Sequence, residues 1–321
     1  MILYRWQGLA SNFGDELNTI LWDRLLPDFF DENPAVRFLG IGSVLDRRHA
    51  GAPLKIVAGS GYGGYEGRPN LDSSWIIHWV RGPRTAAVLG LPAKLALGDP
   101  AVLVPSTLGL PTGGQGATIG FMPHFESAAR GAWQQAADQA GVRLIDPRGS
   151  PEAILEAISG CKLLLSEALH GVIVADALRV PWIPIRPLAR VHRAKWWDWA
   201  ETMDTRPRFQ VLPASSPSEW ASALPLRSWH AGRVWLDRQD RRLEDVRSDR
   251  MVARAGKALL LATQATPQLS ADAALDRCQS RMLDAVRAIR TNPLRGAVLV
   301  RPRQSRLHVV DESAYQLKVI G

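Results

Sequence analysis

The stretch CKLLLSEALHGVIVADALRVPWIPI, residues 161–185, decides the fold class of this chain. It begins with the apolar run CKLLLS, continues as a helix predicted from Leu169 to Leu178, and ends on the apolar run WIPI. Two short buried strands joined by a helix are typical of a βαβ unit, whose strands run parallel and carry helices on both faces of the sheet. The stretch therefore predicts an α/β architecture.

The same alternation continues on both sides of this stretch. Helices are predicted at 14–26, 83–89 and 126–140, and a further helix begins at Ser150, where Pro151 and Glu152 occupy its first turn. Short apolar runs between these helices predict the strands ILYRW, VRFLG, KIVAG, WIIHWV, ATIGFM and VRLID. Repetition of strand and helix along the chain favours mainly parallel sheets.

The stretch PSTLGLPTGGQG, residues 105–116, interrupts this alternation and predicts a connector with little packing of its own. We therefore expect two doubly wound, Rossmann-like domains facing a cleft, at residues 1–112 and 113–215. Residues 216–321 are expected to form a mainly helical, basic C-terminal extension that ends in the short apolar pieces AVLVRP and RLHVVD, both candidate strands.

Composition excludes several classes of protein. The 321 residues are 46% hydrophobic and 22% charged, which is ordinary for a globular chain of this length. No apolar run reaches the roughly 18–20 residues that span a bilayer, and the N-terminus lacks the pattern of a signal peptide, so we expect a cytoplasmic protein. Cys161 and Cys278 have no partners at metal-ligand spacing, so we expect no disulfide and no metal.

The net charge of +8 is unevenly distributed. Residues 1–112 hold ten basic and ten acidic side chains, so the whole excess lies after them. Near the C-terminus few acidic residues accompany the arginines Arg277, Arg281, Arg287, Arg290, Arg295, Arg301, Arg303 and Arg306. Because no nucleic-acid-binding signature accompanies them, we expect no nucleic-acid partner. A solvated helix face and contact with an anionic membrane remain as alternatives.

In parallel sheets, ligands bind beyond the carboxyl ends of strands, where helices begin. The first such loop contains Asn12, Asp15 and Glu16, and it predicts either a simple helix cap or a site in which one of the two acids is a base. The second loop, GSGYGG, includes Gly61 and is either a turn or a place where the backbone approaches a ligand. The third contains Arg81 and Arg84, which form either an anion clamp or a pair of surface arginines.

The second half of the chain adds two histidines at the same level of the sheet. His124 follows the strand ATIGFM, and His170 follows CKLLLS. The strand WIPI then leads into a basic loop that suits a small polyanion, with Arg186, Arg190, His192, Arg193 and Lys195. After it, Trp196, Trp197 and Trp199 form either helix core or a surface that stacks on sugar rings.

Together the segments NFGDEL, GSGYGG, VRGP, LGDPAVL, MPH and LSEALHGVIVADALRVPWIPI resemble the polysaccharide pyruvyl transferases over about residues 1–205. This resemblance implies a GT-B-like pair of domains and transfer of the pyruvyl group of phosphoenolpyruvate onto a sugar, closing a cyclic ketal. It also implies that Arg81 binds the donor and that His170 is essential. The chain departs from the family pattern at Ala168, where many members have Arg, and at Ser11, where they have Gly.

The resemblance and the residue inventory together assign candidate roles. We expect His170 as general acid and either His124 or Asp15 as base. The expected donor contacts are Arg81, Arg84, Leu169, Gly171, Arg186, Arg190 and Arg193, and the expected acceptor contacts are Asn12, Gly61, Trp196 and Trp197. No cofactor is expected.

The expected partners are phosphoenolpyruvate, a lipid-linked saccharide acceptor and the anionic inner face of the plasma membrane. Two other functions remain open at this point. One is a nucleotide-sugar-dependent glycosyltransferase on the same architecture, and the other is a non-catalytic scaffold of polysaccharide assembly.

Overall fold

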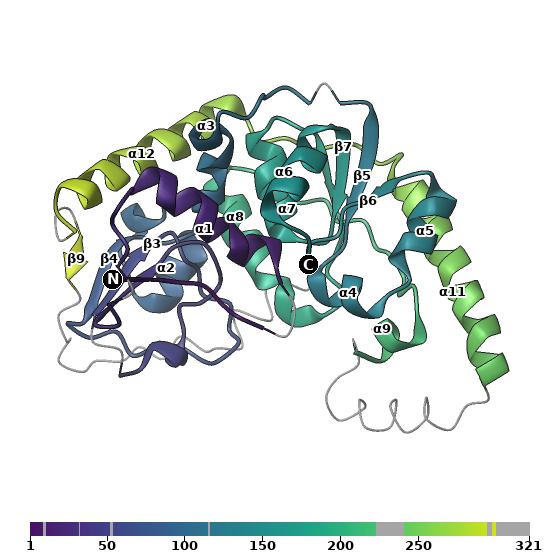
Figure 1. The fold of residues 1–321 in the computed structure, drawn as a ribbon, viewed down its shortest axis with the longest axis horizontal. Coiled ribbons are helices and arrows are strands. Elements are labelled where there is room, and N and C mark those ends of the chain that lie inside the picture. Colours follow the sequence, from purple (N-terminus) through teal and green to yellow (C-terminus); the bar gives the residue numbers. More distant parts are fainter. Residues whose placement is uncertain are drawn as a thin grey trace.

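The computed structural model describes residues 1–8, 11–31, 33–51, 54–114, 116–222, 241–293 and 297–299. In this part of the chain the strands form two separate sheets (Figure 1). The first sheet has the strand order β1-β2-β3-β4-β9, formed by Ile2–Tyr4, Val36–Leu39, Leu54–Ala58, Trp75–Trp79 and Val298–Leu299. The second has the order β6-β5-β7-β8, in which β5 is Thr118–Met122, β6 is Arg143–Leu144, β7 is Cys161–Ser166 and β8 is Trp182–Pro184.

Strands β1 to β4 run parallel, as do all strands of the second sheet, so the predicted α/β architecture with parallel sheets is confirmed. Ile56 in β3 pairs with Phe38 on one side and with Ile76 on the other, which places three apolar positions in register. The short strand predicted in AVLVRP is β9, which pairs antiparallel with β4. The strand predicted in RLHVVD, residues 306–311, lies outside the described residues.

Helices follow the strands as the alternation predicts. They are α1 Phe13–Leu25, α2 Pro83–Leu89, α3 Val104–Leu108, α4 Phe125–Arg130, α5 Trp133–Ala140, α6 Pro151–Ser159, α7 Leu169–Ala177, α8 Ala194–Thr202, α9 Pro217–Ser222, α11 Arg241–Ala262 and α12 Asp272–Thr291. Short 3₁₀ helices are η1 Arg47–His49, η2 Ala93–Leu95, η3 Pro100–Leu103 and η4 Arg190–His192. The start predicted at Ser150 is confirmed, since its Oγ accepts a hydrogen bond from the Ala153 N–H at 3.3 Å.

The single helix predicted over 126–140 is wrong, because the chain breaks it at Gly131 into α4 and α5. A Cβ at Gly131 would lie 2.5 Å from the indole ring of Trp133, so the break lets this ring pack close to the backbone. The ring of Trp133 then packs against Phe121 of β5, with ring centroids 5.0 Å apart. Packing against the sheet therefore overrides the local preference for one continuous helix.

The connector predicted at 105–116 packs more than expected. Its first residues belong to α3, which contacts both α1 and α7. Leu108 and Leu110 pack against the main apolar core, and the Gly113 N–H donates to the Leu178 carbonyl at 2.9 Å. The glycine and proline content of this stretch indicates irregular backbone but does not exclude a fixed position.

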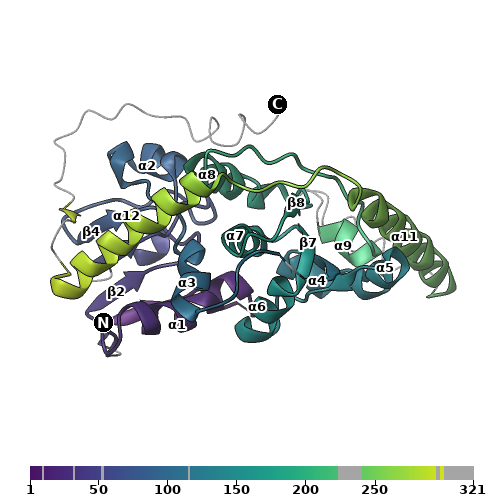
Figure 2. The same cartoon turned by 90° about the horizontal axis from the view of Figure 1, so that it is seen from above.

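One apolar core joins the helices that cover the two sheets. Leu17 and Leu21 of α1, Leu155 of α6 and Val172 of α7 all belong to it. At the ends of the molecule, α12 packs against η3 and α11 against α5 (Figures 1 and 2). The division into domains at 1–112, 113–215 and 216–321 stays a prediction. Within the described residues, no helix combines the length and the apolar character needed to cross a membrane.

Candidate active site

Loops at the carboxyl ends of parallel strands gather the candidate side chains. His170 lies in the first turn of α7, directly after β7, and its side chain is 11% exposed. Its Nε2 lies 3.4 Å from Oδ2 of Asp99, a residue that is completely buried at the start of η3. The other carboxylate oxygen of Asp99 accepts from the Ala101 N–H at 3.1 Å, so its orientation is fixed by the backbone.

Electrostatics favour a carboxylate at Asp99. Burial by itself raises the pKa of Asp99, but the nearby His170 and the charge of Arg81 outweigh burial, and the net pKa is lowered. Asp99 belongs to the sequence motif LGDPAVL. The sequence alone indicates only a turn at this position, because His170, which lies beside Asp99, comes from a helix that is distant in the sequence.

The first turn of α1 approaches the same imidazole. A Cβ at Gly14 would lie only 1.9 Å from Nδ1 of His170, so the absence of a side chain at Gly14 allows this contact. Asp15 follows it and is buried, and its Oδ2 accepts from Nδ2 of Asn12 at 2.5 Å. Burial raises the pKa of Asp15, which His170, Asn12 and Lys195 partly oppose. The structure therefore brings Asp15 and His170 together.

The positions of Asn12 and Glu16 bear on the two interpretations of this loop, a simple helix cap or a site in which one of the two acids is a base. Asn12 is the N-cap residue of α1, but its side chain forms no cap hydrogen bond and holds the Asp15 carboxylate instead. Glu16 pairs with Arg5. Of the two acids, Asp15 is therefore the one whose pKa, raised by burial, the nearby His170 partly lowers.

Arg81 is completely buried and is tied to α8. Its Nε donates to Oδ2 of Asp198 at 3.0 Å and its Nη1 to Oγ of Ser43 at 2.6 Å. A Cβ at Gly61 would lie 2.2 Å from Cζ of Arg81, so Gly61 lies against the guanidinium. Arg81 is therefore not an open clamp, because each of its three guanidinium nitrogens already donates a hydrogen bond, to Asp198, Ser43 or Tyr62.

Asp198 of α8 holds the loop that carries Arg81. Besides Arg81, its carboxylate accepts from the Thr85 N–H at 2.8 Å and the Thr85 hydroxyl at 2.6 Å. The sequence gives no sign of this role, because nothing in the tryptophan-rich segment indicates a partner more than a hundred positions earlier.

Arg84 does not form the predicted clamp with Arg81. Its guanidinium pairs with Glu201 at 2.6 Å and lies 5.7 Å from the ring centroid of Trp197. Both partners belong to α8 and are solvent-accessible. The placement matches the alternative of a surface arginine.

Lys195 is the basic residue that the structure brings into the site. It lies half-buried in the first turn of α8, and within the described part of the chain its Nζ has no hydrogen bond or ion pair. Burial and the charge of Arg81 lower the pKa of Lys195 to about 8, against the opposite effect of carboxylates that include Asp15. Such a partly desolvated ammonium is suited to an anionic ligand.

His124 lies beside a second histidine. Its ring stacks on His192 of η4, with centroids 4.0 Å apart and planes at 28°. His192 in turn contacts Glu126 through Nε2 at 3.3 Å and the Tyr65 hydroxyl through Nδ1 at 3.1 Å. Burial, then the neighbouring His192, lowers the pKa of His124 well below its usual range, so His124 is neutral near pH 7.

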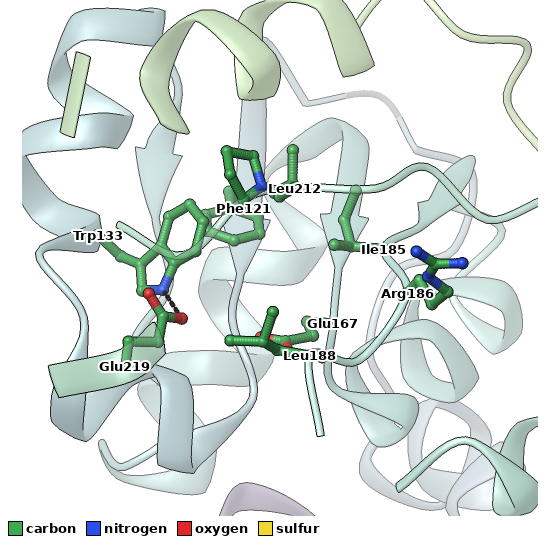
Figure 3. Close-up of a pocket in the computed structure, with 9 residues that line it drawn as sticks. Phe121, Trp133, Glu167, Ile185, Arg186, Leu188, Leu212 and Glu219 are labelled. Atoms are coloured by element: carbon green, nitrogen blue, oxygen red, sulfur yellow. Dashed lines mark hydrogen bonds between the residues drawn. The ribbon is translucent and has the colours of Figure 1, made fainter. Parts of the chain in front are cut away.

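Glu167, another buried residue that the sequence did not single out, holds the loops around this pair. It accepts from the His124 N–H and from the Leu188 N–H, both at 2.9 Å. It also lines a pocket beside the second sheet, in which Trp133 Nε1 donates to Glu219 at 2.8 Å (Figure 3). Arg186 lies at the edge of this pocket and points away from Glu219 (Figure 3).

The remaining candidates are placed as follows. Arg186 and Arg190 are exposed, whereas Arg193 donates to the carbonyls of Pro187 and Leu188 and so fixes its own loop. Leu169 and Gly171 are buried at the start of α7, where only their backbone can face a ligand.

Trp196 has no exposed surface and packs on Phe209, with centroids 5.2 Å apart. Its placement matches the core alternative, and stacking of Trp196 on a sugar does not fit this structure.

Fold and site together define an α/β protein with an acid, a histidine and a desolvated lysine at the ends of parallel strands. The family model for polysaccharide pyruvyl transferases matches residues 77–187, which include Arg81, Asp99, His124 and His170. The succinoglycan biosynthesis protein ExoV of Rhizobium meliloti (strain 1021) is 35% identical over 313 residues, covering 88% of this chain and 98% of that protein. No solved structure gives a significant match. The chain belongs to the polysaccharide pyruvyl transferase family.

Proposed function

We propose that this protein transfers the pyruvyl group of phosphoenolpyruvate to a sugar of a lipid-linked exopolysaccharide repeat unit and closes a cyclic ketal. The observation that carries the proposal is the His170–Asp99 pair, which meets the first turn of α1 at Gly14 and Asp15. In this proposal the two sheets form a GT-B-like pair of domains and the reaction takes place between them. The relative ExoV, named for succinoglycan biosynthesis, supports a saccharide acceptor.

Donor binding follows from the charges around His170. Phosphoenolpyruvate carries a phosphate and a carboxylate, and each needs a cation or a helix N-terminus. Lys195 supplies an ammonium without a partner among the described residues, and Arg81 adds a buried charge close enough to lower the pKa of Lys195. The N-terminus of α7 adds the backbone N–H groups near Leu169 and Gly171.

Acid and base follow from the two sides of the site. His170, with Asp99 beside Nε2, donates a proton to the methylene carbon of the donor, which becomes a methyl group next to an oxocarbenium centre. Asp15, whose pKa burial raises, accepts the proton of the attacking sugar hydroxyl. Loss of phosphate and attack by a second hydroxyl close the ketal, and the proton of this second hydroxyl leaves with the phosphate.

The acceptor is expected on the α1 side of the site, next to Asn12 and Gly61. Trp197 is half-buried beneath Arg84 and is available to a larger saccharide. Because a lipid-linked acceptor stays in its membrane, we also propose peripheral contact of the basic C-terminal segment with the anionic cytoplasmic face. Among its described arginines, Arg277 and Arg287 already pair with acidic side chains, and Arg290 forms no ion pair with a described residue.

The test combines ligand binding with turnover. Phosphoenolpyruvate is expected to raise the unfolding temperature of the wild type, since a ligand that binds only the folded state stabilises it. Arg81→Lys and His170→Gln are expected to lose phosphate release in the presence of a lipid-linked saccharide. Arg84→Lys is the matched control, because that arginine is tied to Glu201, and it is expected to keep activity. Stabilisation by uridine nucleotides alone would favour a glycosyltransferase, and binding without turnover would favour a scaffold.

A further inference from the structure

His124, Glu126 and His192 form a compact group of ligand atoms beside the proposed site. One imidazole nitrogen from each histidine and one oxygen of Glu126 all lie within 4.8 Å of one another. They come from the loop after β5, the first turn of α4 and the 3₁₀ helix η4. Two histidines and one carboxylate are a donor set that binds divalent transition metals, and they leave a coordination position open.

The spacing of the group fits a metal ion. Two ligands at about 2.0–2.1 Å from a tetrahedral ion lie roughly 3.3 Å apart. Nε2 of His192 and Oε2 of Glu126 are 3.3 Å apart. The rings of His124 and His192 are stacked, so His124 has to turn its ring before both histidines can direct a nitrogen at one ion. Its ring carries no hydrogen bond within the described residues that would resist such a turn.

The surroundings orient the ligands. The Tyr65 hydroxyl lies 3.1 Å from Nδ1 of His192, which leaves Nε2 as the nitrogen directed at Glu126. Metal-ligating histidines typically engage their second ring nitrogen in this way. Glu167 fixes the backbone of His124 through a bond to its N–H.

We propose that His124, Glu126 and His192 bind one divalent transition-metal ion of the zinc class, with the fourth position open to an oxygen ligand. The spacing of these residues in the sequence does not indicate such a site, and the sequence alone predicts no metal. Metal binding does not depend on the proposed function. If that function holds, the open position takes an oxygen of the donor phosphate or of the acceptor, because Lys195 is close enough to both Glu126 and Asp15 for their charges to raise its pKa.

The experiment uses the full chain without an affinity tag, stripped with a chelator and titrated with Zn²⁺ by calorimetry. One ion per chain is expected, and Glu126→Gln and His192→Ala are each expected to weaken binding at least tenfold. The control His78→Gln changes a buried histidine that contacts the Pro293 carbonyl, and it is expected to bind like the wild type.

Titration with Co²⁺ adds a second measurement on the same variants. A visible absorption band of a four- or five-coordinate nitrogen and oxygen site is expected in the wild type and not in Glu126→Gln. If His192→Ala fails to fold, Glu126→Gln decides the question, because that carboxylate is only half-buried. Zn²⁺ binding that is absent from the wild type, or unchanged in Glu126→Gln, would overturn the proposal whether or not pyruvyl transfer is found.

Discussion

Replacing Asp198 by Asn removes a buried negative charge and hardly changes the shape of the side chain. The side chains of Asp198 and Arg81 have no exposed surface, and the carboxylate accepts three hydrogen bonds, one from Arg81 and two from Thr85. An amide keeps one carbonyl oxygen for the Thr85 N–H. It cannot accept from Arg81 and the Thr85 hydroxyl as the carboxylate does, and the arginine loses its buried anionic partner.

Removing one partner of a buried ion pair costs about 3–5 kcal/mol. Because Asn retains one of the Thr85 bonds, and Arg81 still donates to Ser43 and Tyr62, we expect the lower end, about 3 kcal/mol of the free energy of unfolding. If the free energy of unfolding decreases by roughly 3 kcal/mol per molar urea, the urea concentration at the midpoint of unfolding falls by on the order of 1 M.

Urea unfolding followed by tryptophan fluorescence measures this loss. The matched control is Glu201→Gln, the same chemical change three positions along α8, which breaks the exposed pair with Arg84 and is expected to cost less than about 1 kcal/mol. Asp198→Asn is also expected to weaken donor binding, whereas Glu201→Gln is not. Equal midpoints for the two variants would refute the idea that the buried pair anchors Arg81.

Three further predictions concern other parts of the molecule. Gly14→Ala places a Cβ against Nδ1 of His170 and so displaces the ring. We expect kcat to fall about 100-fold with little change in the urea midpoint of unfolding. An unchanged kcat would show that residue 14 and the His170 ring are not in contact. Burial lowers the pKa of His49 to about 4. Between pH 6.5 and 4 the unfolded state therefore binds more protons than the folded state, and the free energy of unfolding falls as the pH falls, by about 3 kcal/mol at pH 4. Urea titrations at several pH values are expected to show that His49→Gln lacks this pH dependence. The pKa of Lys195, lowered to about 8, predicts that calorimetric affinity for phosphoenolpyruvate falls as the pH rises from 7 to 9, and Lys195→Met is expected to bind weakly with a flat profile.

The architecture was predictable because short apolar runs alternate with helix signals along the chain. The rule that ligands bind at the carboxyl ends of parallel strands then selects the loops of Asp15, Arg81, His124 and His170 without knowledge of the fold. Two of these residues, Asp15 and His170, lie close enough for His170 to lower the pKa of Asp15 against the effect of burial, and Gly14 beside Asp15 adjoins the His170 ring.

Tertiary contacts explain what the sequence could not predict. Asp99 looks like a turn residue until α7 brings His170 to it, and Asp198 looks like one acid in an aromatic helix until it meets Arg81. The tryptophan spacing of α8 suits a buried face and a sugar-stacking face equally well. Only packing against Phe209 distinguishes the two for Trp196.

Helix boundaries show the same limit. Nothing in the sequence of 126–140 requires a break, since Gly131 is tolerated within many helices. The break arises because Trp133 packs on Phe121 and donates to Glu219, residues that are distant in the sequence.

The most direct test of the account is the fate of the pyruvyl group in heavy water. The wild type is incubated in D₂O with phosphoenolpyruvate and a lipid-linked saccharide, and the product is examined by mass spectrometry and NMR. The account predicts one phosphate released per ketal formed and a ketal methyl group that carries a single deuteron, neither of which His170→Gln yields. A saccharide that gains no pyruvyl group, or a ketal methyl group without deuterium, would contradict it.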